Sequence, residues 1–344
     1  MSVVLAGSDH RELFSHLLLY GVGQLCADAG VSDVLLSWTE GATPRPQIAG
    51  VDGGELAALV AAHAARHAEE GSWIQLGQPA EPTRGLFSPR LRPPADGAAW
   101  ADLQLARQRA LDVMTEERDV LALRMIAALG EPAYWPVSGR DGDVRPDDGA
   151  SRLDMQARNQ GSEIVGTKLR PLASAVAMRE PDVVLEGLLG RRTVDDLAGT
   201  RTDGRTATNL RQLGPTDSTQ AWVALWGLTT VPVAPQVGHP TRTAIHVPRK
   251  RSDPDVIPRA GAFAVPVWHA WWRPARLRAV LTSRPLAEVA AAVAAGEEPP
   301  GNAQDHLQRR GVLGIVVFPV STGGSASAPE RRALGGQLHR FAST

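Results

Sequence analysis

The residues best suited to chemistry lie in one polar stretch near the middle of the chain, residues 151–170, SRLDMQARNQGSEIVGTKLR. Five of its side chains are cationic or carry an amide: Arg152, Arg158, Asn159, Lys168 and Arg170. Guanidinium and ammonium groups bind phosphate oxygens, and Gly161 and Gly166 would let a phosphate or another backbone approach closely. The stretch therefore predicts a contact surface for a polyanion.

A second basic region follows in the later part of the chain. Residues 239–284 carry nine Arg or Lys and two Asp, a net charge of +7. The candidates for phosphate contact here are Arg242, Arg249, Lys250, Arg251 and Arg273. Residues 1–75 have the opposite balance, three Arg against nine Asp or Glu, a net charge of −6. This asymmetry predicts a charged partner that contacts mainly the basic region. A solvated turn is the alternative interpretation of residues 248–252.

Tryptophans cluster beside Arg273 in PVWHAWWRPAR. Trp268 and Trp272 would share one face of a strand, while Trp271 would point to the other side. The rings could stack on exposed bases, or they could fill a core or a subunit interface. The core or interface is the favoured interpretation, with at least one ring exposed.

Metal and nucleotide motifs are weak. His63 and His67 lie four residues apart and would share a helix face, but Ala64 stands where a zinc-protease motif needs Glu, so we expect a surface histidine pair. Gly21 and Gly23 fall late in a helical pattern rather than after a strand, which predicts close helix packing instead of dinucleotide binding. The sequence predicts no catalytic residue, no metal and no cofactor.

The elements that must position these residues follow from periodicity, caps and breakers. Asp9 with Glu12 has the spacing of a capping box, and Asp217 with Ser218 can cap a short buried helix. The expected helices span residues 10–29, 55–70, 99–129 (as one helix or two), 163–178, 183–189, 221–227, 285–295 and 330–341. The expected strands span residues 3–5, 34–38, 47–49, 73–76, 241–247, 262–268, 277–282 and 312–320.

These elements predict an α+β protein with two lobes of mixed helices and short, mainly antiparallel sheets. The expected lobes are an acidic one at residues 1–140, with a long Pro-rich loop at 77–98, and a basic one at 141–344. Cys26 is the only cysteine of the 344 residues, which rules out a disulfide within the chain and favours a reducing compartment. No apolar run is long enough to cross a bilayer, so we expect a cytoplasmic protein without a membrane partner.

Several stretches together resemble the large subunits of type I CRISPR surveillance complexes (Cascade), in particular those of type I-G, formerly I-U. The chain opens with HRELFSHLLLYGVGQLCADAG followed by VLLSW, which is similar to the start of those proteins. RLDMQARNQGSEIVGTKLR, STQAWVALWGL and AFAVPVWHAWWRP resemble a central polar block, a short Trp- and Leu-rich helix and a late strand of the same family. With 344 residues, the chain is short for a large subunit.

The resemblance implies a non-catalytic subunit of an RNA-guided ribonucleoprotein that acts in antiviral defence. Such a subunit contacts crRNA and target DNA next to the protospacer-adjacent motif, binds other CRISPR subunits and presents the complex to the nuclease-helicase. Arg152, Arg158, Asn159, Lys168 and Arg170 then become candidates for contact with the nucleic-acid backbone and base edges. Two alternatives stay open: an enzyme acting on a nucleotide or small anion in a cleft between the lobes, and a scaffold protein without a ligand.

Overall fold

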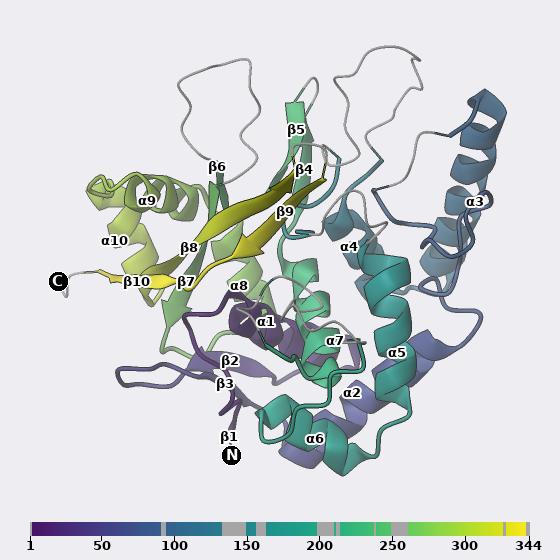
Figure 1. Cartoon of the computed structure of the whole chain (residues 1–344). Coiled ribbons are helices and arrows are strands. Elements are labelled where there is room, and N and C mark those ends of the chain that lie inside the picture. Colours follow the sequence, from purple (N-terminus) through teal and green to yellow (C-terminus); the bar gives the residue numbers. More distant parts are fainter. Residues whose placement is uncertain are drawn as a thin grey trace.

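A buried helix, α1 (Leu13–Asp28), lies at the centre of the fold in the computed structural model of the chain (Figure 1). The structure describes residues 2–90, 94–132, 149–155, 163–197, 210, 214–236, 239–248, 261–325 and 328–341. Helix α7 (Ser218–Trp226) packs along α1 at a point where the two backbones touch. A Cβ added to Gly21 would collide with the carbonyl of Val223, which confirms that Gly21 serves helix packing.

Three further helices complete this helical layer. Helix α2 (Gly53–Ala68) begins at Asp52, whose carboxylate accepts the backbone N–H of Glu55 at 2.8 Å as an N-cap. It packs against α5 (Arg170–Ala177) and α6 (Pro181–Leu189). Elements from both halves of the sequence therefore share the same helical layer.

The remaining helices lie around the layer and the sheets (Figure 1). They are α3 (Gly97–Glu116), α4 (Val120–Leu129), the π-helical turn η2 (Val165–Leu169), the 3-10 turn η3 (Gly227–Thr230), α8 (Pro274–Leu281), α9 (Arg284–Ala294) and α10 (Gly301–Arg309). The region expected as one helix or two at residues 99–129 is divided into α3 and α4.

The described strands form three sheets, and every pairing in them is antiparallel. The largest has the order β10-β8-β7-β6, with β9 paired to β8 beside it, and the others are β1-β3-β2 and β4-β5. The strand bounds are β1 Ser2–Val4, β2 Leu35–Trp38, β3 Pro46–Ala49, β4 Val233–Gln236, β5 His239–Thr243, β6 His246–Pro248, β7 Gly261–Trp268, β8 Val312–Ser325, β9 Ala328–Ala333 and β10 Gln337–Arg340. The predicted α+β class with mainly antiparallel sheets is confirmed.

Five local predictions were wrong. Residues 241–247, expected as one strand, contain the end of β5, a turn and the start of β6, and these two strands belong to different sheets. Residues 73–76, expected as a strand, form turns, and residues 277–282, also expected as a strand, belong mostly to α8. Residues 330–341, expected as a helix, contain parts of β9 and β10 because both segments pair with the long strand β8. The capping box at Asp9 does not form: α1 begins at Leu13, and the Asp9 carboxylate instead accepts the backbone N–H of Arg11 at 2.9 Å.

The hydrophobic core is one connected cluster that contains residues from both halves, including Leu17, Val60, Trp222 and Phe263. The predicted boundary between the lobes, at residues 140 and 141, lies outside the described residues. Within the described part of the chain, no helix combines the length and the apolar character needed to cross a bilayer.

Candidate nucleic-acid interface

The segment Ser151–Met155, the start of the polar stretch, is a buried meeting point of distant elements. All five of its residues are buried. The backbone N–H of Ser151 donates to the carbonyl of Leu129 at the end of α4 (2.8 Å). The N–H of Arg152 donates to Oγ1 of Thr243 on β5 (2.7 Å), and the carbonyl of Met155 accepts the N–H of Arg331 on β9 (3.3 Å). Helix α4 and strands β5 and β9 are thus joined by five residues.

Arginine side chains gather around this segment. Arg90 forms an ion pair with Asp154 (Nη1 to Oδ1, 3.2 Å), and it also donates to the Asp154 carbonyl. The guanidinium of Arg331 reaches the same carbonyl oxygen at 3.5 Å. Arg90, Arg152 and Arg331, with Asp154, are called the arginine cluster below. All four side chains are buried; Arg90 pairs with the Asp154 carboxylate, Arg331 reaches the Asp154 carbonyl, and the charges of Arg152 and Arg331 both act on His246.

The electrostatic effect of the cluster is visible at His246 on β6. Burial, and to a smaller extent the positive charges of Arg152 and Arg331, lowers the pKa of His246 to about 4. His246 is therefore neutral at physiological pH, and Arg152 and Arg331 lie close enough to act on it. The edge strand β6 accordingly faces the arginine cluster.

The cluster brings together some of the predicted site residues. Arg152 belongs to it, and the exposed Arg242 lies on β5 next to Thr243. Five other predicted site residues lie outside the described residues: Arg158, Asn159, Arg249, Lys250 and Arg251. Arg158 and Asn159 follow Met155 in the sequence, and Met155 accepts the backbone N–H of Arg331. Arg249, Lys250 and Arg251 follow Pro248, the last residue of β6, and β6 carries His246, on which Arg152 and Arg331 act. Their predicted role stays a prediction.

Arg170, further along the polar stretch, makes contacts inside the protein. Its guanidinium donates at 3.2 to 3.4 Å to the backbone carbonyls of Ile74, Gln75, Leu76, Pro82 and Thr83. It thereby holds the start of the Pro-rich loop against α5. Lys168 lies half-buried on the π-helical turn η2. The predicted nucleic-acid contacts of Arg170 and Lys168 stay predictions.

Glu163 fastens the same loop from the other side. Its fully buried carboxylate accepts the backbone N–H groups of Gly85 (3.2 Å), Val165 (2.7 Å) and Gly166. Burial raises the pKa of Glu163, and these three hydrogen bonds oppose the shift. A Cβ on Gly166 would meet the carbonyl of Thr83 at 2.6 Å, so the close approach predicted at this glycine is to another backbone.

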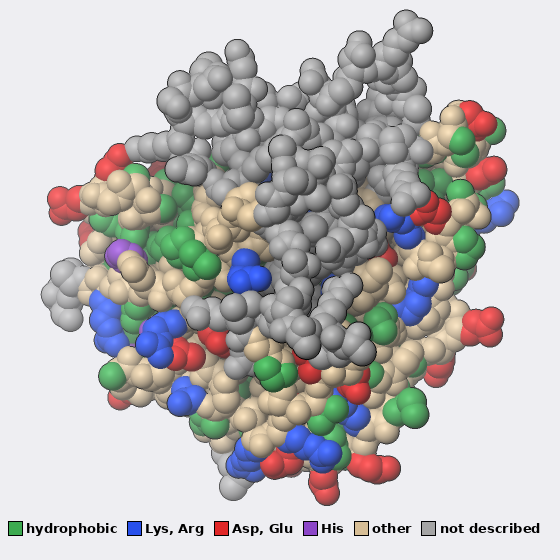
Figure 2. Space-filling model, viewed as in Figure 1, with side chains coloured by type: hydrophobic (Ala, Val, Ile, Leu, Met, Phe, Trp, Pro, Cys, Tyr) green, Lys and Arg blue, Asp and Glu red, His purple; other side chains and the backbone are tan. Residues whose placement is uncertain are grey.

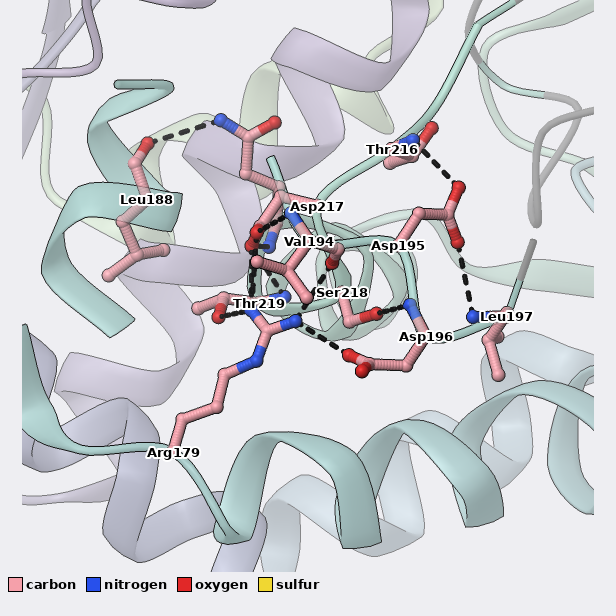
Figure 3. A network of polar contacts seen from close by, with 11 residues as sticks. Arg179, Leu188, Val194, Asp195, Asp196, Leu197, Thr216, Asp217, Ser218 and Thr219 are labelled. Carbon is pink, nitrogen blue, oxygen red and sulfur yellow. Dashed lines mark hydrogen bonds and ion pairs between the residues drawn. The ribbon is translucent and has the colours of Figure 1, made fainter. Parts of the chain in front are cut away.

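A second buried polar network lies at the start of α7 (Figure 3). Asp217 caps the helix, as the sequence predicted: its carboxylate accepts the backbone N–H groups of Thr219 (2.8 Å) and Val194 (2.9 Å). Arg179 pairs with Asp217 (Nη1 to Oδ1, 3.1 Å) and with Asp196 (Nη2 to Oδ2, 2.6 Å). Because hydrogen-bond donors already occupy these carboxylates, the network locks residues 194–197 against α7.

The histidine pair is not on the surface, and that prediction was wrong. His63 and His67 on α2 are buried, and the ring of His67 stacks on Trp226 with 4.9 Å between centroids. Burial lowers the pKa of His67 to about 3 and that of His63 well below its usual value. Three or more His, Cys, Asp or Glu side chains do not come together as a possible metal site anywhere in the described ranges.

The tryptophans near Arg273 divide between core and surface, as expected. Trp268 and Trp272 are fully buried and stack with their centroids 4.4 Å apart and planes 8° apart. Trp271 is 40 % exposed. Arg273 is also exposed, donates to the carbonyl of Ser32 (3.0 Å) and lies 3.6 Å from the carboxylate of Asp33. It is therefore separate from the arginine cluster in its contacts.

Sequence reasoning missed Arg90 and Arg331, which complete the cluster, and Arg179. Arg90 lies in the Pro-rich loop, and Arg331 lies in a segment that was expected to be helical. No local signal marks either one, because their common partner Asp154 is 64 residues from Arg90 and 177 from Arg331.

Comparison of the sequence with models of known protein families gives no match, and comparison with curated proteins gives none either.

Proposed function

We propose that the protein is a non-catalytic, nucleic-acid-binding subunit of an RNA-guided CRISPR interference complex. In this role it contacts crRNA or target DNA next to the protospacer-adjacent motif, and it acts in the cytoplasm with other CRISPR subunits and the nuclease-helicase. The proposal rests on the sequence resemblance and on one structural observation. That observation is the arginine cluster, which lies beside Met155 and strand β6. These precede two basic segments of the sequence, residues 156–162 and 249–260.

The arginine cluster supports this proposal through charge and connectivity. It gathers the guanidinium groups of Arg90, Arg152 and Arg331 in one region of the fold, where Arg90 pairs with Asp154 and the charges of Arg152 and Arg331 lower the pKa of His246. Residues 156–162 follow it directly and carry Arg158 and Asn159, and residues 249–260 follow β6 and carry Arg249, Lys250 and Arg251. Arg242 is exposed on the adjacent strand β5. The proposal is supported by the position of the described residues that precede these two segments, Met155 and Pro248, because Met155 contacts Arg331 and the strand that ends at Pro248 carries His246.

The described surface supplies no competing basic area on the face shown in Figure 2. There, Lys and Arg side chains are interspersed with Asp and Glu over the lower part of the molecule. A mixed surface of this kind attracts a polyanion weakly. We therefore propose that the two basic segments and Arg242 bind phosphate, with Arg273 as a separate contact, and that acidic side chains within residues 1–75 bind protein partners.

The test is a titration of the protein, alone and with its partner subunits, against labelled crRNA and duplex DNA between about 50 and 200 mM salt. Each Arg158→Ala or Arg251→Ala change should weaken binding and lower the slope of log affinity against log salt by about 0.9 on duplex DNA, the value for one phosphate contact. Arg284→Ala is the matched control, since it removes one charge from an exposed arginine that is paired with Glu288 on α9.

Binding that is absent, or that does not respond to salt even with the partner subunits present, contradicts the proposal. So does a control variant that lowers the slope as much as Arg158→Ala and Arg251→Ala.

A further inference from the structure

The small sheet β1-β3-β2 has an outer face that the core does not cover. Leu36 and Ile48 point inward and are fully buried, and α1 packs on that side. Leu35, Gln47 and Ala49 alternate outward and are half-buried, whereas Ser37, also on this face, is covered and donates to the carbonyl of His269 at 2.8 Å. The sheet therefore has one face in the core and one in contact with solvent.

Residues 271–273 lie beside the edge strand β2 of this sheet, joined to it by one isolated bridge. Leu36 and Trp272 exchange both backbone hydrogen bonds, at 2.8 and 2.9 Å, in an antiparallel bridge. Continuing this register places Trp271 opposite Ser37 and Arg273 opposite Leu35. Because Trp272 is buried, its neighbours Trp271 and Arg273 belong to the outer face, and both are exposed.

The position of Trp271 is rigid. The next ring, Trp272, stacks on Trp268, and Nε1 of Trp268 donates to the carbonyl of Leu36 at 3.0 Å. Arg276 lies over the ring of Trp272, 5.2 Å from its centroid, and donates to the carbonyl of Arg310 at 2.6 Å. An exposed indole is thus presented by a fixed backbone, and little conformational entropy would be lost when a ligand binds.

The charges around Trp271 favour an anionic ligand with a planar group. Arg273 is exposed two residues away on the same face, and its guanidinium lies 3.6 Å from the carboxylate of the exposed Asp33. A flat sheet face that combines an aromatic ring with a guanidinium group fits a nucleotide: the ring stacks on the base, and the guanidinium pairs with the phosphate.

We propose that Trp271 is a stacking platform for an unpaired base of single-stranded DNA, with Arg273 holding the adjacent phosphate. This inference rests on the proposed function, since opening of the duplex beside the protospacer-adjacent motif supplies such a strand. The platform is distinct from the arginine cluster, because its residues lie on β2 and the chain after β7.

The test is a titration of the full chain with a labelled oligothymidine of about 12 nucleotides, within the usual site size of single-strand binders. Trp271→Ala should weaken binding by about 5- to 150-fold, the factor that corresponds to stacking one base on an aromatic ring. Trp271→Phe keeps a ring and should retain most of the affinity. On a strand of equal length with abasic sites in place of the bases, wild type and Trp271→Ala should bind equally.

Leu334→Ala is the matched control, because Leu334 is similarly exposed, at 42 %, and lies away from this face at the end of β9. It should leave the binding of oligothymidine unchanged. Thermal unfolding of each variant checks that it is folded.

Two results overturn the inference. In the first, Trp271→Ala binds oligothymidine as tightly as wild type. In the second, Trp271→Ala weakens binding to the abasic strand by the same factor as binding to oligothymidine. Loss of self-association in Trp271→Ala, with unchanged DNA binding, would also overturn it and would mark the face as a contact between copies. If the wild-type protein binds duplex DNA and crRNA with the expected salt dependence, but Trp271→Ala does not change the binding of oligothymidine, only the stacking platform is refuted. Wild type that binds no nucleic acid at low salt refutes the proposed function as well.

Discussion

Mild acid should unfold this protein because it buries histidines in their neutral form. The ring of His16 is fully buried, with its centroid 4.4 Å from that of Trp38 and its Nε2 2.8 Å from the carbonyl oxygen of His10. Burial lowers the pKa of His16 and His67 from 6.5 to about 3, and that of His246 to about 4. The folded chain therefore binds fewer protons than the unfolded chain below pH 6.5.

The sign follows from this difference. The stability that these histidines contribute is fully present above pH 6.5 and is lost progressively as the pH falls toward their folded pKa values of about 3 to 4. At pH 5 each histidine lowers the free energy of unfolding by about 2 kcal/mol, so the three together lower it by about 6 kcal/mol. The total free energy of unfolding of a domain is about 5 to 15 kcal/mol, so a loss of this size is enough to unfold a marginally stable protein.

Other groups modify this value. Buried His10 adds to the loss, because burial lowers its pKa below 6.5. His63 adds to the loss, because burial lowers its pKa well below 6.5. Glu163 offsets part of it, because burial raises the pKa of its carboxyl and protonation then favours the folded state. The sum still favours unfolding near pH 5.

The assay is urea unfolding followed by tryptophan fluorescence, from about pH 7.5 to about pH 5. Below about pH 6 the free energy of unfolding should fall by about 4 kcal/mol per pH unit, or about 1.4 for each of the three histidines. His16→Phe keeps an aromatic ring and should remove about 1.4 kcal/mol per pH unit from that slope. His306→Gln, on the exposed side of α10, is the control and should keep the wild-type slope. Stability that is constant over this range, or an unchanged slope in His16→Phe, would refute the reasoning.

Two packing predictions can be checked by the same unfolding assay. Gly21→Ala should destabilise by at least about 3 kcal/mol, although helix propensity alone favours Ala, because the new Cβ meets the α7 backbone. Gly71→Ala, with open space around it, should change stability little. Arg179→Met should cost about 3 to 5 kcal/mol by leaving the buried Asp217 unpaired, whereas Arg191→Met, which breaks an exposed pair, should cost less than about 1 kcal/mol. Equal effects of the matched changes would contradict both arguments.

Features that depend on neighbouring residues could be predicted from the sequence. Asp217 before STQAWVALW indicated an N-cap, and its carboxylate does accept backbone N–H groups at the start of α7. Gly21 indicated close helix packing, which the contact with α7 confirms. The alternation around Trp271 indicated one exposed ring.

Secondary structure that depends on pairing with a distant part of the chain could not be predicted. Residues 330–341 are rich in helix-forming Arg, Ala, Leu and Gln, yet β9 and β10 form because β8 is long enough to pair with both. Residues 277–282 have the apolar content of a strand, but the turn that begins at Pro274 directs them into α8. Intrinsic preferences are worth less than about 1 kcal/mol per residue, so tertiary pairing overrides them.

The amino-acid sequence by itself indicated the polar character of residues 151–155 and the cap at Asp217, because each depends on residues a few positions apart. Gly21 indicated a close contact, and only the fold supplied its partner, Val223. Only the tertiary structure decided that Arg90 and Arg331 meet at Asp154, and that His63 and His67 are buried beside tryptophans. The physical reason is that burial and charge pairing are set by contacts between residues far apart in the chain, and no local pattern carries that information.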